Sequence, residues 1–138
     1  MSIQPLRTLP VLLLALGACG ESATEIPSDP VEAIEMGDQA LSNSELEVAL
    51  QAYRSVADSA EAQDSLKYQS LIKLGRTQLA MNDPAAAKVS FTKARNDYGH
   101  LYDFKDCVKI VDAYIQNGMA DEADAELKMA FEKFPDKG

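Results

Sequence analysis

The sequence predicts an all-α fold in which helices follow one another in pairs. Helix caps and breakers divide most of the chain into segments of helical length, and no alternation of polar and apolar residues is long enough to predict a strand. One spacing of small and large apolar residues also recurs three times along these segments. The chain of 138 residues has room for one small domain or a short array of repeats.

Residues 1–18 have the composition of a targeting segment. Their only charged residue is Arg7, and the apolar run that follows it is roughly half the ~20 residues that a membrane-spanning helix needs. A basic start, a short apolar run and small residues at its end are typical of a secretory signal peptide. We therefore expect residues 1–18 to be removed from the mature chain.

The end of this segment carries a more specific pattern. Residues 16–19 (Leu-Gly-Ala-Cys) resemble the lipobox of bacterial lipoproteins. The resemblance implies that Cys19 becomes the first residue of the mature chain, carries acyl chains such as palmitate and anchors the protein to a membrane. The alternative is an ordinary cleaved signal peptide followed by an unrelated cysteine.

The residues after Cys19 bear on localisation. In Gram-negative lipoproteins an aspartate at the next position retains the protein in the inner membrane, whereas this chain has Gly20. The resemblance therefore implies, for a Gram-negative host, the periplasmic face of the outer membrane. Residues 19–28 are small, polar and without periodicity, so we expect a flexible tether that keeps the folded domain, residues 29–138, close to the membrane.

Six helices are expected, and particular residues mark their ends. Asp29 before Pro30 is an N-cap followed by a proline in the first turn, and residues 82–84 (Asn-Asp-Pro) repeat this arrangement. Residues 42–44 (Ser-Asn-Ser) interrupt the first helix, and Gly118 is a helix stop. The expected helices are 30–42, 45–60, 64–81, 84–97, 103–117 and 120–133.

The recurrent spacing lies on the second helix of each expected pair. A small residue is followed by two further apolar residues at helical spacing, as in Ala49/Tyr53/Val56, Ala87/Phe91/Ala94 and Ala123/Leu127/Ala130. Before each first alanine, in the first helix of the pair, stand Gly37, Gly75 and Val111. We expect the small residues to let the two helices approach closely, with Ala87 facing Gly75. The larger Tyr53, Phe91 and Leu127 are then expected to fill the gap to the neighbouring pair.

This pattern resembles the tetratricopeptide repeat, a helix–turn–helix unit of about 34 residues. The resemblance implies about three repeats, at 30–63, 68–101 and 104–137, stacked as a right-handed α-solenoid. The chain departs from the family pattern at Val111, which replaces a small residue, and at Gln78, which replaces an aromatic or aliphatic one. A six-helix bundle of another kind with coincident spacing is the alternative.

Composition argues against several classes of function. The chain carries 13 basic and 22 acidic residues, and a surface with a formal net charge of -9 repels nucleic acid. His100 lies in a turn and Cys107 on the packing face of its helix, so neither is expected to act as a catalytic base or nucleophile. Since no phosphate-binding loop or metal-ligand spacing is found, we expect no enzyme activity, no cofactor and no bound metal.

The last expected helix combines acidic and apolar residues. The acidic ones are expected to complement the helix dipole and face solvent, with a cation site as the alternative; they are Asp121, Glu122, Asp124 and Glu126. Arrays usually need an additional polar-faced helix to cover apolar residues such as Phe131 and Phe134. We therefore expect exposed apolar area there unless a partner or a second copy covers it.

In tetratricopeptide proteins the first helix of each unit lines a concave groove that holds a peptide or helix of a partner. The matching positions place two apolar residues around one charged residue in each unit: Ile34, Asp38 and Leu41, then Ile72, Arg76 and Leu79, then Val108, Asp112 and Ile115. Such a stripe suits an amphipathic or extended apolar segment. Chaperone-type members grip a C-terminal carboxylate with Lys and Asn at the positions of Ile34 and Asp38, so that site is not expected. The alternative is that these residues pack within the array.

The sequence therefore predicts a non-enzymatic, membrane-anchored adaptor or scaffold. Through its groove it would bind a segment or helix of a cell-envelope protein, in the assembly or localisation of an envelope complex. The alternative is a self-associating structural lipoprotein that forms a homodimer through its last helix.

Overall fold

The computed structural model describes residues 23–137, which form six α-helices, one short 3₁₀ helix and no strand. The helices are α2 (Pro30–Ser42), α3 (Leu46–Ala57), α4 (Asp64–Ala80), α5 (Pro84–Asp97), α6 (Phe104–Gln116), α7 (Ala120–Lys133) and η1 (Pro135–Lys137). The predicted all-α class is confirmed, and α2, α5 and α7 have the predicted bounds. The predicted signal peptide and the acylated Cys19 lie outside the described residues.

Aspartate side chains cap three of the helices and so determine where those helices begin. The Asp29 carboxylate accepts hydrogen bonds from the backbone N–H groups of Val31 and Glu32 at 2.9 and 3.0 Å. Asp83 and Asp103 cap α5 and α6 in the same way. Each cap satisfies N–H groups that have no partner within the helix.

The second helix is shorter than predicted, since α3 ends at Ala57 rather than at residue 60. The Ser59 hydroxyl oxygen accepts hydrogen bonds from the backbone N–H groups of Glu61 and Ala62 at 3.2 and 3.1 Å. A serine hydroxyl that takes up nearby N–H groups offers the backbone an alternative to the helix. The chain therefore turns at Ser59 toward α4.

The turns inside the three helix pairs share one geometry. A residue with a left-handed φ follows α2, α4 and α6, namely Ser44 (65°), Asn82 (63°) and Gly118 (72°). In each turn the next N–H group returns to the carbonyl group five residues back, at 2.8 Å for Glu45 to Ala40, 2.8 Å for Asp83 to Gln78 and 2.9 Å for Met119 to Tyr114. This is the hydrogen bond of a Schellman motif. The three pairs therefore have the same internal connection.

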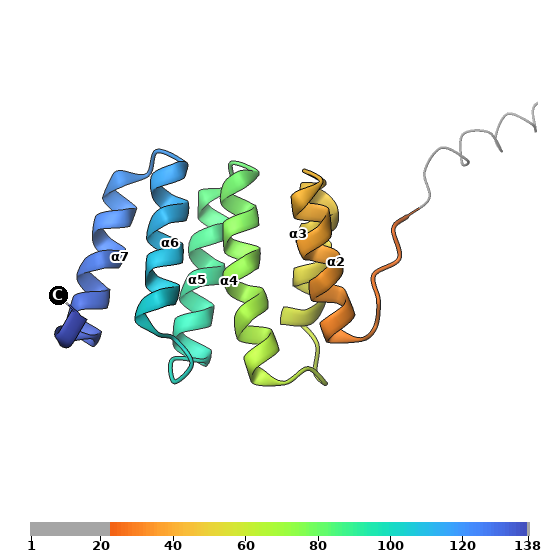
Figure 1. Cartoon of the computed structure of the whole chain (residues 1–138), viewed down its shortest axis with the longest axis horizontal. Helices are drawn as coiled ribbons and strands as arrows, with labels where there is room; N and C mark the ends of the chain where they lie inside the picture. Colours follow the sequence, from red (N-terminus) through yellow and green to blue (C-terminus); the bar gives the residue numbers. More distant parts are fainter. Residues whose placement is uncertain (1–22, 138) are drawn as a thin grey trace, which may run out of the picture.

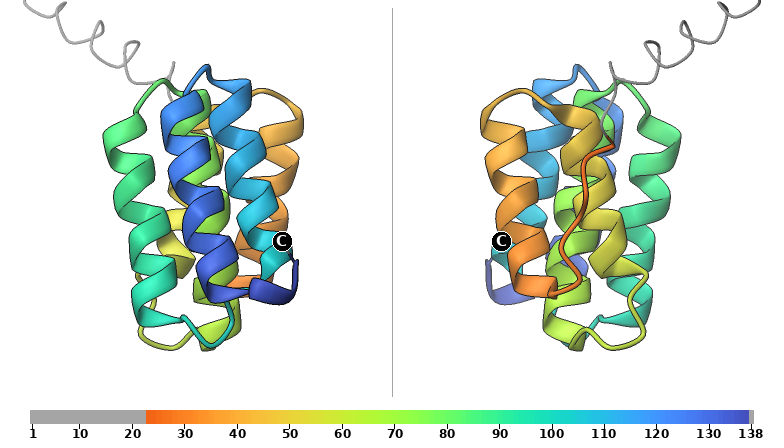
Figure 2. Two further views of the ribbon diagram at one scale, coloured as in Figure 1. Left: turned by 90° about the vertical axis from the view of Figure 1, so that its left-hand side faces the viewer. Right: turned by 90° about the vertical axis from the view of Figure 1, so that its right-hand side faces the viewer.

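The pairs α2–α3, α4–α5 and α6–α7 follow one another in a row along the long axis of the molecule (Figure 1). In this view α2, α4 and α6 lie on the near face with α3 and α5 behind them, and the end views agree (Figure 2). Contacts between successive pairs run from α3 to α4, from α2 to α4 and from α4 to α6. The first helices of the three pairs therefore form one face.

Glycine in the first helix of a pair makes room for an aromatic ring from the second. A Cβ at Gly37 would lie 2.5 Å from the Tyr53 ring, and one at Gly75 would lie 2.7 Å from Cδ1 of Phe91. The sequence predicts these two rings in the gap to the neighbouring pair, and the structure shows that each also lies against the glycine of its own pair. The atoms nearest to a Cβ at Gly75 belong to Phe91 rather than to the expected Ala87. Phe91 also reaches the next pair, where it meets the Tyr114 ring edge-on at 5.6 Å.

Neighbouring residues accommodate the two departures from the repeat pattern. Val111 takes the place of glycine in the third pair, and the smaller Leu127 takes the place of the aromatic ring, with both packed in one cluster. Gln78 is buried, and its side-chain oxygen accepts a hydrogen bond of 2.6 Å from the Ser90 hydroxyl group. A buried amide oxygen that is hydrogen-bonded avoids most of the cost of leaving water.

The core consists of two clusters of buried side chains. One contains residues of α2 and α3, together with Leu74 of α4. The other contains residues of α4 to α7 together with Ala57 of α3, and Phe91 is among its fully buried members. Residues 23–28 belong to the predicted flexible tether, but they run along the first pair (Figure 2), and Ile26 packs against the first cluster. The structure differs from the prediction here because Ile26 adds apolar area to that cluster.

Candidate functional site

Three of the predicted groove residues lie in the core. Ile34, Ile72 and Leu79 are exposed by only 6%, 4% and 2%. Ile34 belongs to the first cluster, and the other two belong to the cluster that also contains residues of α6. Packing within the protein therefore explains their recurrence, and one of the three, Ile72, also lines a pocket.

The other three apolar groove residues are exposed but do not complete a stripe. Leu41 is 36% exposed at the end of α2, while Val108 and Ile115 are 40% and 60% exposed on α6. Leu41 lies on α2 and the other two lie on α6, with α4 between these helices (Figure 1). Within residues 23–137 no further helix pair follows α6 and α7, so no first helix packs against α6 in the way that α6 packs against α4. Val108 and Ile115 therefore face solvent.

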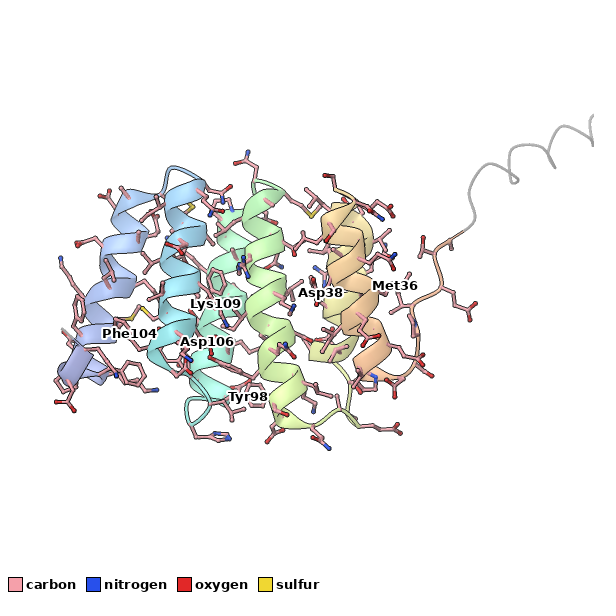
Figure 3. The ribbon with its side chains drawn as sticks, in the orientation of Figure 1. Met36, Asp38, Tyr98, Phe104, Asp106 and Lys109 are labelled. Atoms are coloured by element: carbon pink, nitrogen blue, oxygen red, sulfur yellow. The ribbon has the colours of Figure 1, made fainter. Side chains whose placement is uncertain are left out.

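The face of α2, α4 and α6 instead carries a polar cleft. One part, of about 340 Å³, is lined by residues of α4 and α6, namely Tyr68, Gln69, Ile72, Lys73, Arg76, Asp106 and Lys109. A second part, of about 190 Å³, adds residues of α2 and α3 and includes Asp38, Leu41, Tyr53, Ala80, Ala113, Gln116 and Asn117. Lys73 and Arg76 line both parts, so we treat them as one site, the α2–α4–α6 cleft. Figure 3 shows Asp38 on one side of α4, and Asp106 and Lys109 on the other.

A tyrosine and a lysine hold the Asp38 carboxylate on the α2 side of the cleft. Its Oδ1 atom accepts a hydrogen bond of 2.6 Å from the Tyr53 hydroxyl group and one of 2.5 Å from Lys73. Burial and the hydrogen bond to Asp38 raise the pKa of Tyr53, which keeps this phenol protonated as a donor. Asp38 therefore forms an ion pair with Lys73 and none with Arg76.

The same arrangement recurs on the α6 side of the cleft. Asp106 accepts a hydrogen bond of 2.6 Å from the Tyr68 hydroxyl group and one of 2.8 Å from Lys109. Burial and this hydrogen bond raise the pKa of Tyr68 as well. Sequence analysis missed both tyrosine–aspartate pairs: Tyr53 and Asp38 lie on the two helices of the first pair, whereas Tyr68 and Asp106 lie on helices of different pairs, and neither contact follows from spacing within one helix.

Arg76 is the one cation of the cleft that makes no ion pair within residues 23–137. It is exposed and lies between the two groups described above. Asp112, the acidic groove residue predicted on α6, is exposed and makes no ion pair with Arg76. The guanidinium group, with several donors in one plane, is free to bind a carboxylate.

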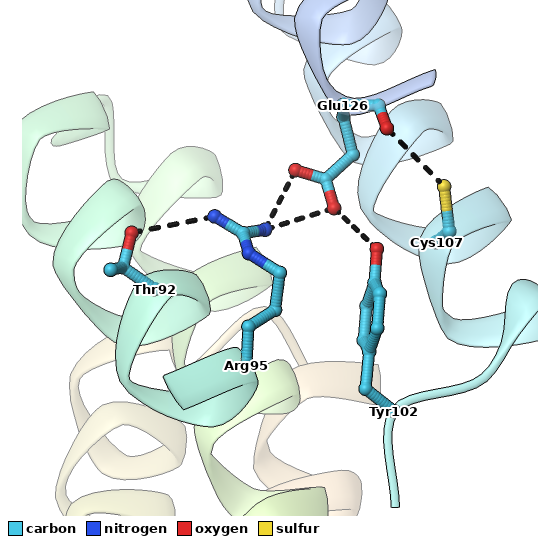
Figure 4. Close-up of polar contacts among 5 residues, drawn as sticks. All are labelled: Thr92, Arg95, Tyr102, Cys107 and Glu126. Atoms are coloured by element: carbon cyan, nitrogen blue, oxygen red, sulfur yellow. Dashed lines mark hydrogen bonds and ion pairs between the residues drawn. The ribbon is translucent and has the colours of Figure 1, made fainter. Parts of the chain in front are cut away.

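A second polar cluster lies inside the protein, where α5, α7 and the chain before α6 meet (Figure 4). Glu126 is 2% exposed, and its two carboxylate oxygens accept hydrogen bonds from Arg95 at 2.9 and 2.7 Å. Tyr102 donates to the same carboxylate at 2.7 Å, and burial raises the pKa of this phenol. The expectation that Glu126 faces solvent is therefore wrong. Its helical spacing from the buried Ala123 and Ala130 is the sequence signal that could have revealed it.

The remaining candidate groups show no catalytic arrangement among the described residues. His100 is exposed in the turn between α5 and α6. Cys107 is fully buried, and burial raises the pKa of its thiol, which is unfavourable for a nucleophile. Within residues 23–137, no group of three or more His, Cys, Asp or Glu side chains could hold a metal ion. No helix in this part of the chain is long and apolar enough to cross a bilayer.

Comparison of the chain with protein-family models, with curated proteins and with solved structures finds no match.

Proposed function

We propose that this protein is a membrane-anchored adaptor with tetratricopeptide-like repeats, which binds a segment of another cell-envelope protein in the α2–α4–α6 cleft. The observation that carries the proposal is the placement of all three first helices on one face with a cleft between them. The shared turn geometry and the glycine–aromatic contacts of the first two pairs support the repeat assignment.

The proposal places binding on the face predicted from the sequence but on different side chains. The predicted apolar residues of α4 stabilise the array, whereas the polar residues around Arg76 are accessible. Tyrosine and lysine side chains hold Asp38 and Asp106 in position, which reduces the entropy that these groups lose when a partner binds. A cleft between helices is also a common location for binding sites.

Crosslinking from the cleft tests this proposal. A photoreactive amino acid at Gln116, which lines the cleft, is expected to give a discrete adduct with an envelope protein in intact cells. The same amino acid at Val89, which is 68% exposed on α5, is the matched control and is expected to give none. Ala80→Trp, which fills the cleft without changing charge, should abolish the Gln116 adduct. Equal adducts from both positions, or an adduct that Ala80→Trp leaves intact, would contradict the proposal.

Membrane anchoring rests on Cys19, which lies outside the described residues. We expect Cys19→Ser to release the protein from the membrane fraction or to leave it unprocessed, because serine cannot carry the thioether-linked lipid. Cys107→Ser is the control, since Cys107 is buried in the folded domain. Fractionation followed by mass measurement decides the outcome. If the Cys19→Ser protein matures and fractionates like the unmodified chain, the lipoprotein assignment is wrong.

Self-association is the second candidate function, and a surface of α7 favours it. Met129 and Phe131 are 41% and 42% exposed, and the centroids of the Phe131 and Phe104 rings are 6.1 Å apart. Clustered exposed apolar side chains are typical of contact surfaces. Sedimentation equilibrium tests this function. An apparent molar mass that rises with protein concentration, and that is lower for Phe131→Ser, would favour self-association over the first function.

A further inference from the structure

We propose that the α2–α4–α6 cleft binds an extended peptide segment through an acidic side chain of that segment, with Arg76 as its principal partner. This inference rests on the proposed function, because it names the chemistry that the same cleft recognises. Three features carry it: the free guanidinium group, the charge of the cleft lining and the shape of the cleft.

The charge of the cleft is opposite to that of the whole chain. The chain has 22 acidic and 13 basic residues, yet three cations and two carboxylates line the cleft. Lys73 and Lys109 pair with the two carboxylates, and each carboxylate also accepts a tyrosine hydroxyl group. The positive charge of Arg76 is therefore the one left over. Charge complementarity at this position selects an anionic group on the ligand.

The type of cation favours a carboxylate. A guanidinium group can donate two parallel hydrogen bonds to one carboxylate, a geometry that an ammonium group cannot provide. Lys73 lines both parts of the cleft beside Arg76 but is paired with Asp38, so Arg76 is the group available to a ligand carboxylate.

The shape of the cleft favours an extended segment. From Gln69 to Ala80 along α4 the cleft spans about 17 Å at the rise of an α-helix, which matches roughly five residues of extended chain. Arg76 lies within this length, so the recognised acid is expected inside the segment rather than at its end. Leu41, Ala80 and Ala113 line the α2 end of the cleft and suit a small apolar residue next to the acid.

Selection from a phage-displayed library of random linear peptides on the purified full chain tests the inference. The selected peptides are expected to share one aspartate or glutamate at an internal position. Synthetic peptides of the selected sequence, with the C-terminus amidated, should bind with affinity that falls about tenfold or more when that acid is changed to its amide. Arg76→Gln should weaken binding of the acidic peptide by a similar factor and leave the affinity for the amide peptide unchanged.

Matched variants make the outcomes distinct. Lys128→Gln removes one positive charge from α7 and should leave binding unchanged, which separates a local contact from the net charge of the protein. Two outcomes would overturn this inference and leave the proposed function standing. In both, Ala80→Trp abolishes binding of the selected peptides, but the peptides either bind without an acidic side chain or require a free C-terminal carboxylate. Peptides that Ala80→Trp does not affect, or a selection that yields no peptide, would overturn both.

Discussion

Replacing Glu126 with Ala is expected to lower the free energy of unfolding by about 3–5 kcal/mol, because it leaves the Arg95 charge without a partner in the protein interior. Arg95 is 20% exposed as a side chain, so part of its charge can reach water and the lower end of this range applies to it. Tyr102 also loses the acceptor of its hydroxyl group. Urea denaturation of the purified full chain measures the change.

Two further variants show whether the buried ion pair itself stabilises the fold. Asp124→Ala removes an acid from the same helix at a position that is 64% exposed, and should change stability by no more than about 0.5 kcal/mol. The double variant Arg95→Met with Glu126→Leu replaces the pair by apolar side chains and should recover most of the lost stability. Equal losses for Glu126→Ala and Asp124→Ala would show that Glu126 is not buried in solution.

Gly75→Val is expected to destabilise the protein by about 1–3 kcal/mol, because the added side chain occupies space that the Phe91 ring fills. Phe91 is fully buried and packs against Tyr114, so its ring has little freedom to move away. Thermal unfolding monitored by circular dichroism is a suitable measurement.

The third helix pair suggests the compensating change. There Val111 and Leu127 stand at the positions of Gly75 and Phe91, so Gly75→Val combined with Phe91→Leu should be more stable than Gly75→Val alone. Gln69→Val, an exposed site on α4, controls for the helix propensity of valine and should cost only about 0.5 kcal/mol. A double variant no more stable than the single one would mean that the two pairs do not pack in the same register.

The helix boundaries could be predicted because local chemistry determines most of them. Asp29 and Asp83 cap their helices through side chains adjacent in sequence, and Gly118 supplies the left-handed turn that sequence alone suggests. The end of α3 could not be predicted in the same way. It depends on the Ser59 hydroxyl oxygen, which accepts hydrogen bonds from two later N–H groups and so competes with a further turn of helix.

The face that carries the cleft could be predicted, but its side chains could not. Helical spacing places Ile72 and Arg76 on neighbouring positions of α4, yet only the approach of α6 buries the first and leaves the second exposed. The hydrogen bond between Tyr68 and Asp106 joins residues of different helix pairs. Such contacts depend on how successive pairs are spaced, and spacing along the chain carries no information about that distance.

The division of the core into two clusters has a consequence for cooperativity. The helices α2 and α3 meet the rest of the protein chiefly through α4, whose Leu74 belongs to the first cluster and whose Leu66 packs against it, while Ala57 of α3 belongs to the second cluster. In a linear array, stability is approximately a sum of the stability of each unit and of its interface with its neighbour. An end pair has only one such interface, so we expect the first pair to open as a subglobal unit while the cluster around Phe91 persists, and we expect amide protons of α2 and α3 to exchange with solvent before those of α5. Because Asp38 and Tyr53 belong to this unit, its opening removes two lining residues from the cleft. A bound segment therefore shifts the equilibrium between the open and closed forms of the first pair toward the closed form.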